Sequence, residues 1–209
     1  EKLCRKYKVF LIADEVATGF GRTGTLFACE QERIKPDFLC VAKAITGGYL
    51  PLAATLTTEK IYQAFKAPVA KNRTFFHGHS YTGNPLACAV ALENLNQIEK
   101  IKLLEKTRQK AHILKDELLT IVDNKHVRSV RQAGLMVGIE LVREKSIDQP
   151  FPSQYRMGAR LCKKLLERGI WIRPLGDVLV IMPPPVIEIA ELKMLVRQVS
   201  DVILHEIKS

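Results

Sequence analysis

Two short apolar runs dominate the first part of the chain, and each ends in an ionisable residue. The run 9–13 is followed by Asp14, and the run 38–42 is followed by Lys43. Each run has the length of a strand buried in a sheet, and 52–57 predicts a third strand. Because ligands of open α/β sheets bind at the carboxyl ends of strands, both endings are candidate site positions.

Helical spacing of apolar residues follows the predicted strands. Asn84 is the expected N-cap of a helix and Pro85 its first residue, since proline lacks the N–H that a first turn leaves unused. Apolar residues keep helical spacing to residue 95, and the pattern resumes over 103–121.

The pattern changes again near residue 126. The elements predicted beyond it are a strand over 135–141, a helix over 155–168 closed by Gly169, short strands over 170–174 and 178–182, and an amphipathic helix over 189–203. This order is typical of a small α+β domain packed on an α/β core. We therefore expect 1–98 to belong to a larger, mostly parallel α/β domain, and 99–209 to form a linking helix and a small C-terminal domain.

The formal net charge of +10 is compatible with nucleic-acid binding. The basic residues are spread, however, and between residues 100 and 110 they alternate with apolar positions. No basic run is interleaved with aromatic residues, and no zinc-finger or RNA-binding motif occurs. We expect a solvated basic surface and no nucleic-acid partner. No apolar run has the length of a membrane span, so we expect no membrane partner either.

The five cysteines are odd in number and none has Cys-x-x-Cys spacing, which favours a reduced, cytoplasmic protein. No signal or transit peptide is recognisable. The chain starts with Glu1, and a helix-like segment leads directly into the first strand. We expect this arrangement from a βαβ protein that continues upstream.

The segment 19–24 spells GxGxxG, the dinucleotide-binding pattern. That motif requires a strand directly before its first glycine and a helix directly after its last. Here Asp14 to Thr18 intervene, and no clear helix follows. We interpret these glycines as a tight loop in which backbone approaches something closely.

An apolar strand that ends in Asp14 and Glu15 also resembles the magnesium-binding strand of ATPases. That function needs a GxxxxGK[ST] phosphate loop, which these residues lack. A nucleotide hydrolase with its phosphate loop upstream stays a remote alternative.

Asp14 and Lys43 are candidates for acting together. Lys43 follows Asp14 by 29 residues (43 − 14 = 29), about the length of a strand and crossover in a parallel sheet. Pyridoxal phosphate needs a lysine for its Schiff base and a carboxylate at its pyridine nitrogen. A buried, unpaired ammonium would be costly, and a bound aldehyde would explain it. A salt bridge between strand ends is the alternative, but Gly47 and Gly48 after the lysine favour the cofactor.

Two stretches together resemble the signature of class III pyridoxal-phosphate-dependent aminotransferases. They read LIADEVATGFGRTG (11–24) and PDFLCVAKAITGG (36–48), in the family's order and spacing, with Ala42 where many members have glycine. The resemblance covers nearly the whole chain and corresponds to the C-terminal half of such enzymes. It implies a fold-type I transferase that acts as a homodimer with a shared active site.

The resemblance also implies roles for individual residues. Lys43 would carry the cofactor, Asp14 would pair with its pyridine nitrogen, and Val16 would pack under its ring. Within HGHSYTGNP (77–85), Ser80 would donate its hydroxyl to the phosphate across the dimer interface, and the Gly78 backbone would lie beside the substrate.

The segments WIRPLGD (171–177) and MPP (182–184) are similar to family members that aminate 8-amino-7-oxononanoate in biotin biosynthesis. Arg173 would then hold the carboxylate of that substrate, for which bidentate guanidinium geometry is suited. The amino donor would be S-adenosylmethionine or lysine. Another ω-amino-acid or diamine aminotransferase of the family is the alternative.

Several of these residues have simpler interpretations. Ser80 could be a turn residue, and Arg173 a surface charge. His77 and His79 suggest loop packing rather than a metal site, because no third ligand lies nearby. No metal is expected, and no chemical role is assigned to Glu15 or Arg22. The family's upstream phosphate loop and the aromatic residue over the ring lie outside these residues, so we expect the 209-residue segment alone to bind cofactor poorly.

Overall fold

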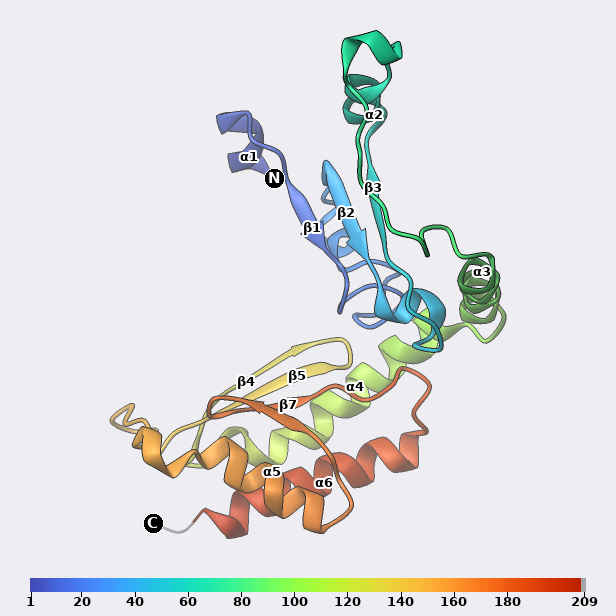
Figure 1. Cartoon of the computed structure of the whole chain (residues 1–209). Helices are drawn as coiled ribbons and strands as arrows, with labels where there is room; N and C mark the ends of the chain where they lie inside the picture. The colour runs from blue at the N-terminus through green and yellow to red at the C-terminus, as the bar shows by residue number, and fades with distance from the viewer. Residues whose placement is uncertain (208–209) are drawn as a thin grey trace. The chain divides into compact units, whose positions relative to one another are not determined.

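The computed structural model describes residues 1–207 and divides the chain into two compact units. Unit 1 comprises residues 1–104, and unit 2 begins at residue 105 (Figure 1). Each unit has its own sheet and its own apolar core, so each is described separately. No helix within residues 1–207 is long and apolar enough to cross a membrane.

Unit 1 contains a three-stranded sheet in the order β1-β2-β3. Strand β1 (Ile12–Asp14) pairs in parallel with β2 (Phe38–Val41), and β2 pairs antiparallel with β3 (Ala54–Thr57). The other elements are helices α1 (Lys2–Tyr7), α2 (Glu59–Phe65) and α3 (Pro85–Lys100), and 3-10 helices η1 (Ala28–Glu32), η2 (Lys43–Thr46) and η3 (Val69–Lys71). All three predicted strands are therefore present, although each is shorter than its apolar run.

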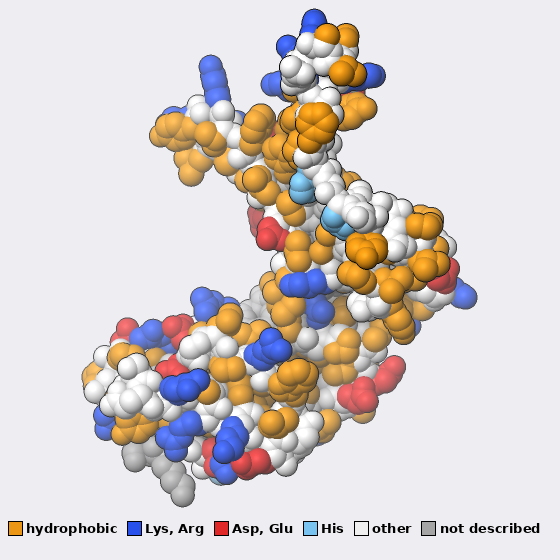
Figure 2. Space-filling view, in the orientation of Figure 1, with side chains coloured by type: hydrophobic (Ala, Val, Ile, Leu, Met, Phe, Trp, Pro, Cys, Tyr) orange, Lys and Arg blue, Asp and Glu red, His pale blue; other side chains and the backbone are white. Residues whose placement is uncertain are grey.

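The expectation of a buried strand is wrong for β1, whereas β2 is half-buried and ends at the buried Val41. Ile12 in β1 is 61% exposed and Leu56 in β3 is 50% exposed. The physical reason is that no helix of unit 1 packs extensively across the strands, so little apolar surface is removed from water. Figure 2 accordingly shows apolar side chains over much of the visible surface of unit 1.

Helix α3 begins as its sequence predicts. The Asn84 side-chain oxygen accepts hydrogen bonds from the Leu86 N–H at 2.9 Å and the Ala87 N–H at 3.4 Å, and Pro85 is the first helical residue. Near the end of α3, Ile98 joins a small core with Phe20 and other apolar residues of unit 1. This core places α3 beside the loop that follows β1.

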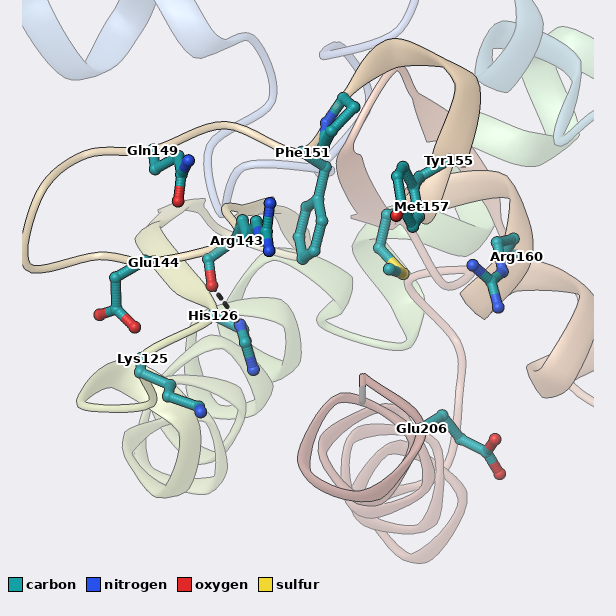
Figure 3. A pocket seen from close by; sticks show the side chains of 11 residues that line it. Lys125, His126, Arg143, Glu144, Gln149, Phe151, Tyr155, Met157, Arg160 and Glu206 are labelled. Atoms are coloured by element: carbon teal, nitrogen blue, oxygen red, sulfur yellow. Dashed lines mark hydrogen bonds between the residues drawn. The ribbon is translucent and has the colours of Figure 1, made fainter. Parts of the chain in front are cut away.

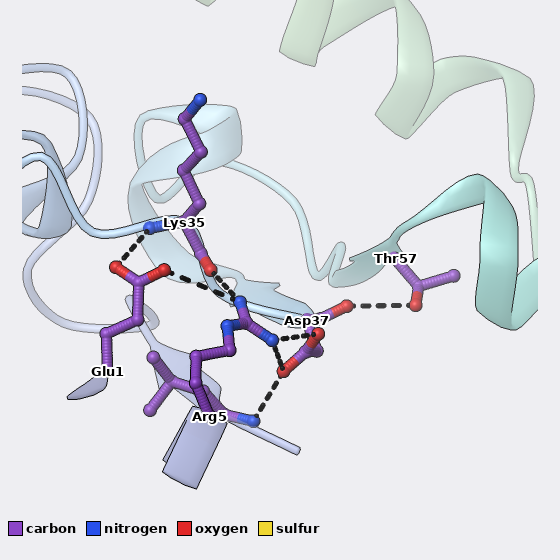
Figure 4. A network of polar contacts seen from close by, with 6 residues as sticks. Glu1, Arg5, Lys35, Asp37 and Thr57 are labelled. Atoms are coloured by element: carbon purple, nitrogen blue, oxygen red, sulfur yellow. Dashed lines mark hydrogen bonds and ion pairs between the residues drawn. The ribbon is translucent and has the colours of Figure 1, made fainter. Parts of the chain in front are cut away.

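A polar network fixes the start of β2 (Figure 4). The Asp37 carboxylate accepts from Arg5 at 2.9 and 3.0 Å and from the Leu11 N–H at 2.8 Å. Its backbone carbonyl accepts from the Thr57 hydroxyl at 3.0 Å. The bond from Leu11 and the bond and charge of Arg5 hold the pKa of Asp37 below its usual value. The network ties α1, the segment before β1, and β3 to the strand that leads to Lys43.

Unit 2 is a four-stranded antiparallel sheet in the order β4-β5-β7-β6. Its strands are β4 (Val127–Ala133), β5 (Met136–Leu141), β6 (Arg173–Leu175) and β7 (Val178–Ile181). Its helices are α4 (Leu103–Val122, which begins in unit 1), the 3-10 turn η4 (Ser153–Tyr155), α5 (Met157–Glu167) and α6 (Ile189–Glu206). Burial alternates along β5 and β7, so one face of the sheet packs on the helices (Figure 1).

The predicted elements of unit 2 are present with one shift and one addition: the strand expected over 170–174 is found as β6 (Arg173–Leu175). Gly169, at φ 79°, follows the end of α5, which confirms the predicted stop. Strand β4 was not predicted because its sequence, VRSVRQA, is largely polar. It pairs all the same with β5, and Arg128 bridges the strands through its 3.0 Å ion pair with Glu140.

The core of unit 2 supports a stability prediction. Leu165 in α5 is fully buried, whereas its neighbour Leu166 is 58% exposed. We expect Leu165→Ala to lower the free energy of unfolding by about 2–5 kcal/mol, because it leaves a cavity in the core. Leu166→Ala is the matched control, and we expect its effect to stay below about 1 kcal/mol. Urea unfolding measures both, and equal losses in the two variants would contradict the assigned packing.

Candidate active site

The parallel pairing of β1 with β2 brings Asp14 and Lys43 to the same edge of the sheet. Asp14, the last residue of β1, lies opposite Cys40, and Lys43 comes three residues after Cys40. The backbone N–H of Glu15 donates to the Cys40 carbonyl at 2.9 Å and extends the pairing by one residue. The spacing of 29 residues therefore corresponds to two adjacent parallel strands, as predicted.

Lys43 is exposed in this structure, so the expectation of a buried ammonium is wrong. Strand β2 ends at the buried Val41, and the chain turns at Lys43 into η2. Lys43 has φ 47°, in the left-handed region that non-glycine residues rarely occupy. Such a conformation costs about 1–3 kcal/mol and is concentrated at functional sites.

Helix α3 holds the turn that carries Lys43. The Asn94 side-chain amide donates to the carbonyls of Ala44 at 2.8 Å and Ile45 at 3.2 Å. Inside the turn, the buried Thr46 hydroxyl donates to the Leu50 carbonyl at 2.6 Å. Sequence reasoning missed Asn94, because nothing in its helical pattern indicates a contact some 50 residues away.

The Asp14 carboxylate is exposed at the end of β1. One of its oxygens accepts a hydrogen bond from the Val16 N–H at 3.0 Å. The carboxylate therefore orients the residue that was predicted to pack under a cofactor ring, and its second oxygen accepts no hydrogen bond from residues 1–207. The site can thus offer one carboxylate and one amine at a common edge.

The glycines of 19–24 lie in a tight loop, and this loop does not have the strand–turn–helix structure of a dinucleotide-binding motif. A side chain at Gly19 would meet the Glu15 carbonyl at 2.9 Å, and one at Gly21 would meet the Leu104 side chain at 3.0 Å. Gly21 and Gly24 also have φ of 94° and 96°, which favour glycine. The next regular element is the 3-10 helix η1, so the tight-loop interpretation is confirmed.

The segment 77–85 is an exposed turn. The Thr82 hydroxyl accepts from the His79 N–H at 2.9 Å, and the His79 ring accepts from the Tyr81 N–H at 3.1 Å. His79 thus has a packing role within the turn, and residues 1–207 contain no cluster of metal ligands. Ser80 and Gly78 are exposed, and no hydrogen bond or ion pair described for residues 1–207 joins them to Asp14 or Lys43.

Arg173 opens strand β6 in unit 2 and is exposed. Its guanidinium lies over the Trp171 ring, 5.4 Å from the ring centroid. The aromatic face restricts the arginine without neutralising it, and no carboxylate among the described residues pairs with it. It can therefore receive an anionic group from a ligand.

A cavity of about 550 Å³ lies elsewhere in unit 2, near the turn before α5 (Figure 3). Its lining includes Phe151, Met157 and the buried His126, whose Nδ1 bonds the Arg143 carbonyl at 2.8 Å. None of the residues predicted to act in catalysis or binding lines this cavity.

A family model described as aminotransferase class-III matches residues 1–203. The chain belongs to the class-III aminotransferases. It is 52% identical, over 195 residues, to the adenosylmethionine-8-amino-7-oxononanoate aminotransferase of Aquifex aeolicus, a match that covers 93% of this chain and 43% of the relative. The enzyme of the same name from Anoxybacillus flavithermus is 50% identical over 205 residues, covering 98% of this chain and 45% of the relative.

Solved structures place this class-III aminotransferase chain in the fold of pyridoxal-phosphate-dependent transaminases. The adenosylmethionine-8-amino-7-oxononanoate aminotransferase of Methanocaldococcus jannaschii superposes with a TM-score of 0.92 at 44% identity, covering 97% of this chain and 47% of that one. An (S)-enantioselective omega-transaminase from Thermomicrobium roseum superposes with a TM-score of 0.92 at 37% sequence identity. That match covers 99% of this chain and 46% of the transaminase. The chain thus spans somewhat under half the length of these relatives, and the family excludes the nucleotide-hydrolase alternative.

Proposed function

We propose that this chain carries the Schiff-base lysine of a pyridoxal-phosphate-dependent aminotransferase. The observation that supports the proposal is the placement of Asp14 and Lys43 at one edge of paired parallel strands. Relatives named for 8-amino-7-oxononanoate, at 46–52% identity, support the conversion of that compound to 7,8-diaminononanoate in biotin biosynthesis. The five unpaired cysteines support a cytoplasmic location.

The groups present fit the cofactor. Its aldehyde requires an accessible amine, and the Lys43 side chain is exposed. Its pyridine nitrogen requires an anion, and Asp14 offers a carboxylate oxygen beside the one that orients Val16. When bound, pyridoxal phosphate supplies a ring that accepts the electrons of the substrate carbon.

Residues of this chain would bind and orient the cofactor and transfer the proton. The Asp14 carboxylate would hold a proton at the pyridine nitrogen, and Val16 would lie under the ring. The Lys43 Nζ, when not holding the cofactor, would be placed to move a proton at the substrate carbon. Ser80 would donate its exposed hydroxyl to the phosphate of a partner's cofactor in a homodimer, and the Gly78 backbone would border the substrate.

The assay that tests this function uses the complete enzyme, which we define as this chain together with a polypeptide equivalent to the part of its relatives that it does not match. With pyridoxal phosphate bound, the enzyme is given 8-amino-7-oxononanoate and either S-adenosylmethionine or lysine. We expect 7,8-diaminononanoate with one donor, and the names of the relatives favour S-adenosylmethionine. Turnover of ω-amino acids or diamines without any diaminononanoate would refute the substrate and favour the alternative within the family.

Arg173 supplies a separate prediction about the substrate carboxylate. We expect Arg173→Ala to raise the KM for 8-amino-7-oxononanoate about 10–100-fold, because a hydrogen-bonded charge is worth about 1.5–3 kcal/mol. Arg173→Lys keeps the positive charge but cannot make the bidentate contact of a guanidinium. Its KM for 8-amino-7-oxononanoate should lie between those of the wild type and Arg173→Ala. The matched control is a keto substrate without a carboxylate, whose KM should not change. Unchanged kinetics with the oxononanoate would show that Arg173 does not bind its carboxylate.

A further inference from the structure

Glu15 is a buried carboxylate without a cationic partner. The residue is 3% exposed, and no ion pair with it occurs among residues 1–207. An ionised carboxylate in such a place is costly unless hydrogen bonds compensate it. The immediate neighbours of Glu15 in the chain are Asp14 and Val16, both assigned to the cofactor.

Hydrogen-bond donors from the following loop surround this carboxylate. One oxygen accepts the Cys29 N–H at 2.8 Å, and the other accepts the Thr18 hydroxyl. Burial, and then the neighbouring Glu15 carboxylate, raise the pKa of the Cys29 thiol, so the thiol stays protonated at neutral pH. Every one of these contacts is of the kind that favours the charged carboxylate.

The charge state of Glu15 follows from the balance of these effects. Burial raises the pKa of Glu15, but the hydrogen bonds from Thr18, Cys29 and Ala28 outweigh burial and leave the pKa below its usual value. Glu15 is therefore ionised at neutral pH. Because its folded-state pKa is lowered, its contribution to stability is present above its unfolded-state pKa and is lost as pH falls through the lowered value.

The backbone of Glu15 joins the same loop to the sheet. Its N–H donates to the Cys40 carbonyl of β2 at 2.9 Å, and its carbonyl accepts from Gly19 at 2.9 Å. The loop thus turns tightly at Gly19, where a side chain would clash with that carbonyl. Backbone and side chain together connect the end of β1 with β2, with the glycine loop and with η1.

We propose that Glu15 is a positioning residue of the aminotransferase site: its ionised carboxylate anchors the loop 16–29 and thereby fixes Asp14 and Val16 against the cofactor. The inference rests on the proposed function, because it needs the cofactor at Asp14. Glu15 itself touches the loop and not the cofactor. In metal sites, outer-shell groups restrict the orientation of the residues that bind the metal. The Glu15 carboxylate would restrict the orientation of Asp14 in the same way.

The experiment compares the pyridoxal phosphate affinity of complete enzymes and the pH at which their bound cofactor changes its visible absorption. In Glu15→Ala we expect affinity to fall about 10–100-fold, by analogy with the loss caused by removing outer-shell partners of metal ligands. The pH midpoint of the visible absorption should also shift, because Asp14 no longer holds a fixed place at the pyridine nitrogen. A purely structural residue would lower stability without moving this midpoint.

Two further variants keep the test informative if Glu15→Ala fails to fold. Glu15→Gln removes the charge but retains the acceptor for Cys29, so it should restore part of the affinity. Thr18→Val deletes one donor at nearly constant volume and should shift the midpoint in the same direction as Glu15→Ala. Glu30→Gln, at an exposed position of η1, is the matched control and should behave as wild type.

The outcomes separate this inference from the proposed function. A wild-type enzyme that shows no visible absorption with pyridoxal phosphate ends the proposed function and the role of Glu15 with it. A wild-type enzyme with normal absorption, beside Glu15 and Thr18 variants of unchanged affinity and midpoint, overturns the role of Glu15 alone. Reduced affinity together with a shifted midpoint in those variants, but not in Glu30→Gln, supports it.

Discussion

Replacing Lys43 with alanine is expected to abolish transamination by the complete enzyme and the visible absorption of its bound cofactor. Loss of a nucleophile that also transfers protons should lower kcat by about 10³-fold or more. The band expected to disappear is the one that a covalent link between cofactor and Lys43 would give, and absorbance spectra of the dialysed protein measure it directly. A visible band that survives in Lys43→Ala would assign the Schiff base to another lysine.

Two variants control for charge and for general loss of lysine. Lys43→Arg keeps a cation in place but cannot form the Schiff base, so we expect the same loss as with alanine. Lys66→Ala removes an exposed lysine at the end of α2 and should leave both absorption and rate unchanged. Thermal unfolding separates chemistry from folding, since the exposed Lys43 side chain contributes little packing. Loss of activity in Lys43→Ala with full activity in Lys43→Arg would favour an electrostatic role instead.

The position of Lys43 shows how far the sequence predicts this site. Its spacing from Asp14 predicted adjacent parallel strands, because chain length limits how a crossover can return to the sheet. Its exposure was not predictable from the same apolar run. An apolar sequence allows a strand to be buried, but actual burial depends on the elements that pack on the strand. In this structure β1 is largely uncovered, and β2 is only half-buried before Val41.

The hydrogen bonds that hold the candidate site could not be predicted from the pattern of apolar and polar residues either. Asn94 reaches the Lys43 turn across 50 residues of sequence, and Glu15 binds Cys29 across 14. Neither residue breaks a helical or strand pattern, so only side-chain geometry identifies them. The cap at Asn84 was predictable because it bonds two and three residues ahead, within one turn of the chain.

Strand β4 illustrates the opposite case, in which local pattern is misleading. Its polar residues reduce the apolar signal, but Arg128 meets Glu140 on the neighbouring strand and Ser129 donates to the same carboxylate at 2.9 Å. Cross-strand pairs of this kind stabilise a sheet without apolar composition. The fold class was therefore predictable from the clear elements, while the edge of the small sheet was not.

Replacing Asp14 with asparagine is expected to lower kcat about 10²–10³-fold, the cost of removing a preorganised charge from an active site. The asparagine oxygen can still accept the Val16 N–H that the Asp14 oxygen accepts now at 3.0 Å. The substitution therefore removes the charge that we propose for the pyridine nitrogen and keeps the local hydrogen bond. Without that charge, this chain would no longer hold a proton at the pyridine nitrogen of a bound cofactor.

The measurement is the rate of a single turnover with saturating substrate, accompanied by the affinity for pyridoxal phosphate. We expect the turnover rate to fall far more than the affinity, because Lys43, which would hold the cofactor, is intact in Asp14→Asn. Asp116→Asn, at an exposed position of α4, is the matched control and should have no effect on either quantity. If Asp14→Asn turned over at the wild-type rate, the pyridine nitrogen would have to find its anion elsewhere in the complete enzyme, and Asp14 would be reduced to the residue that orients Val16.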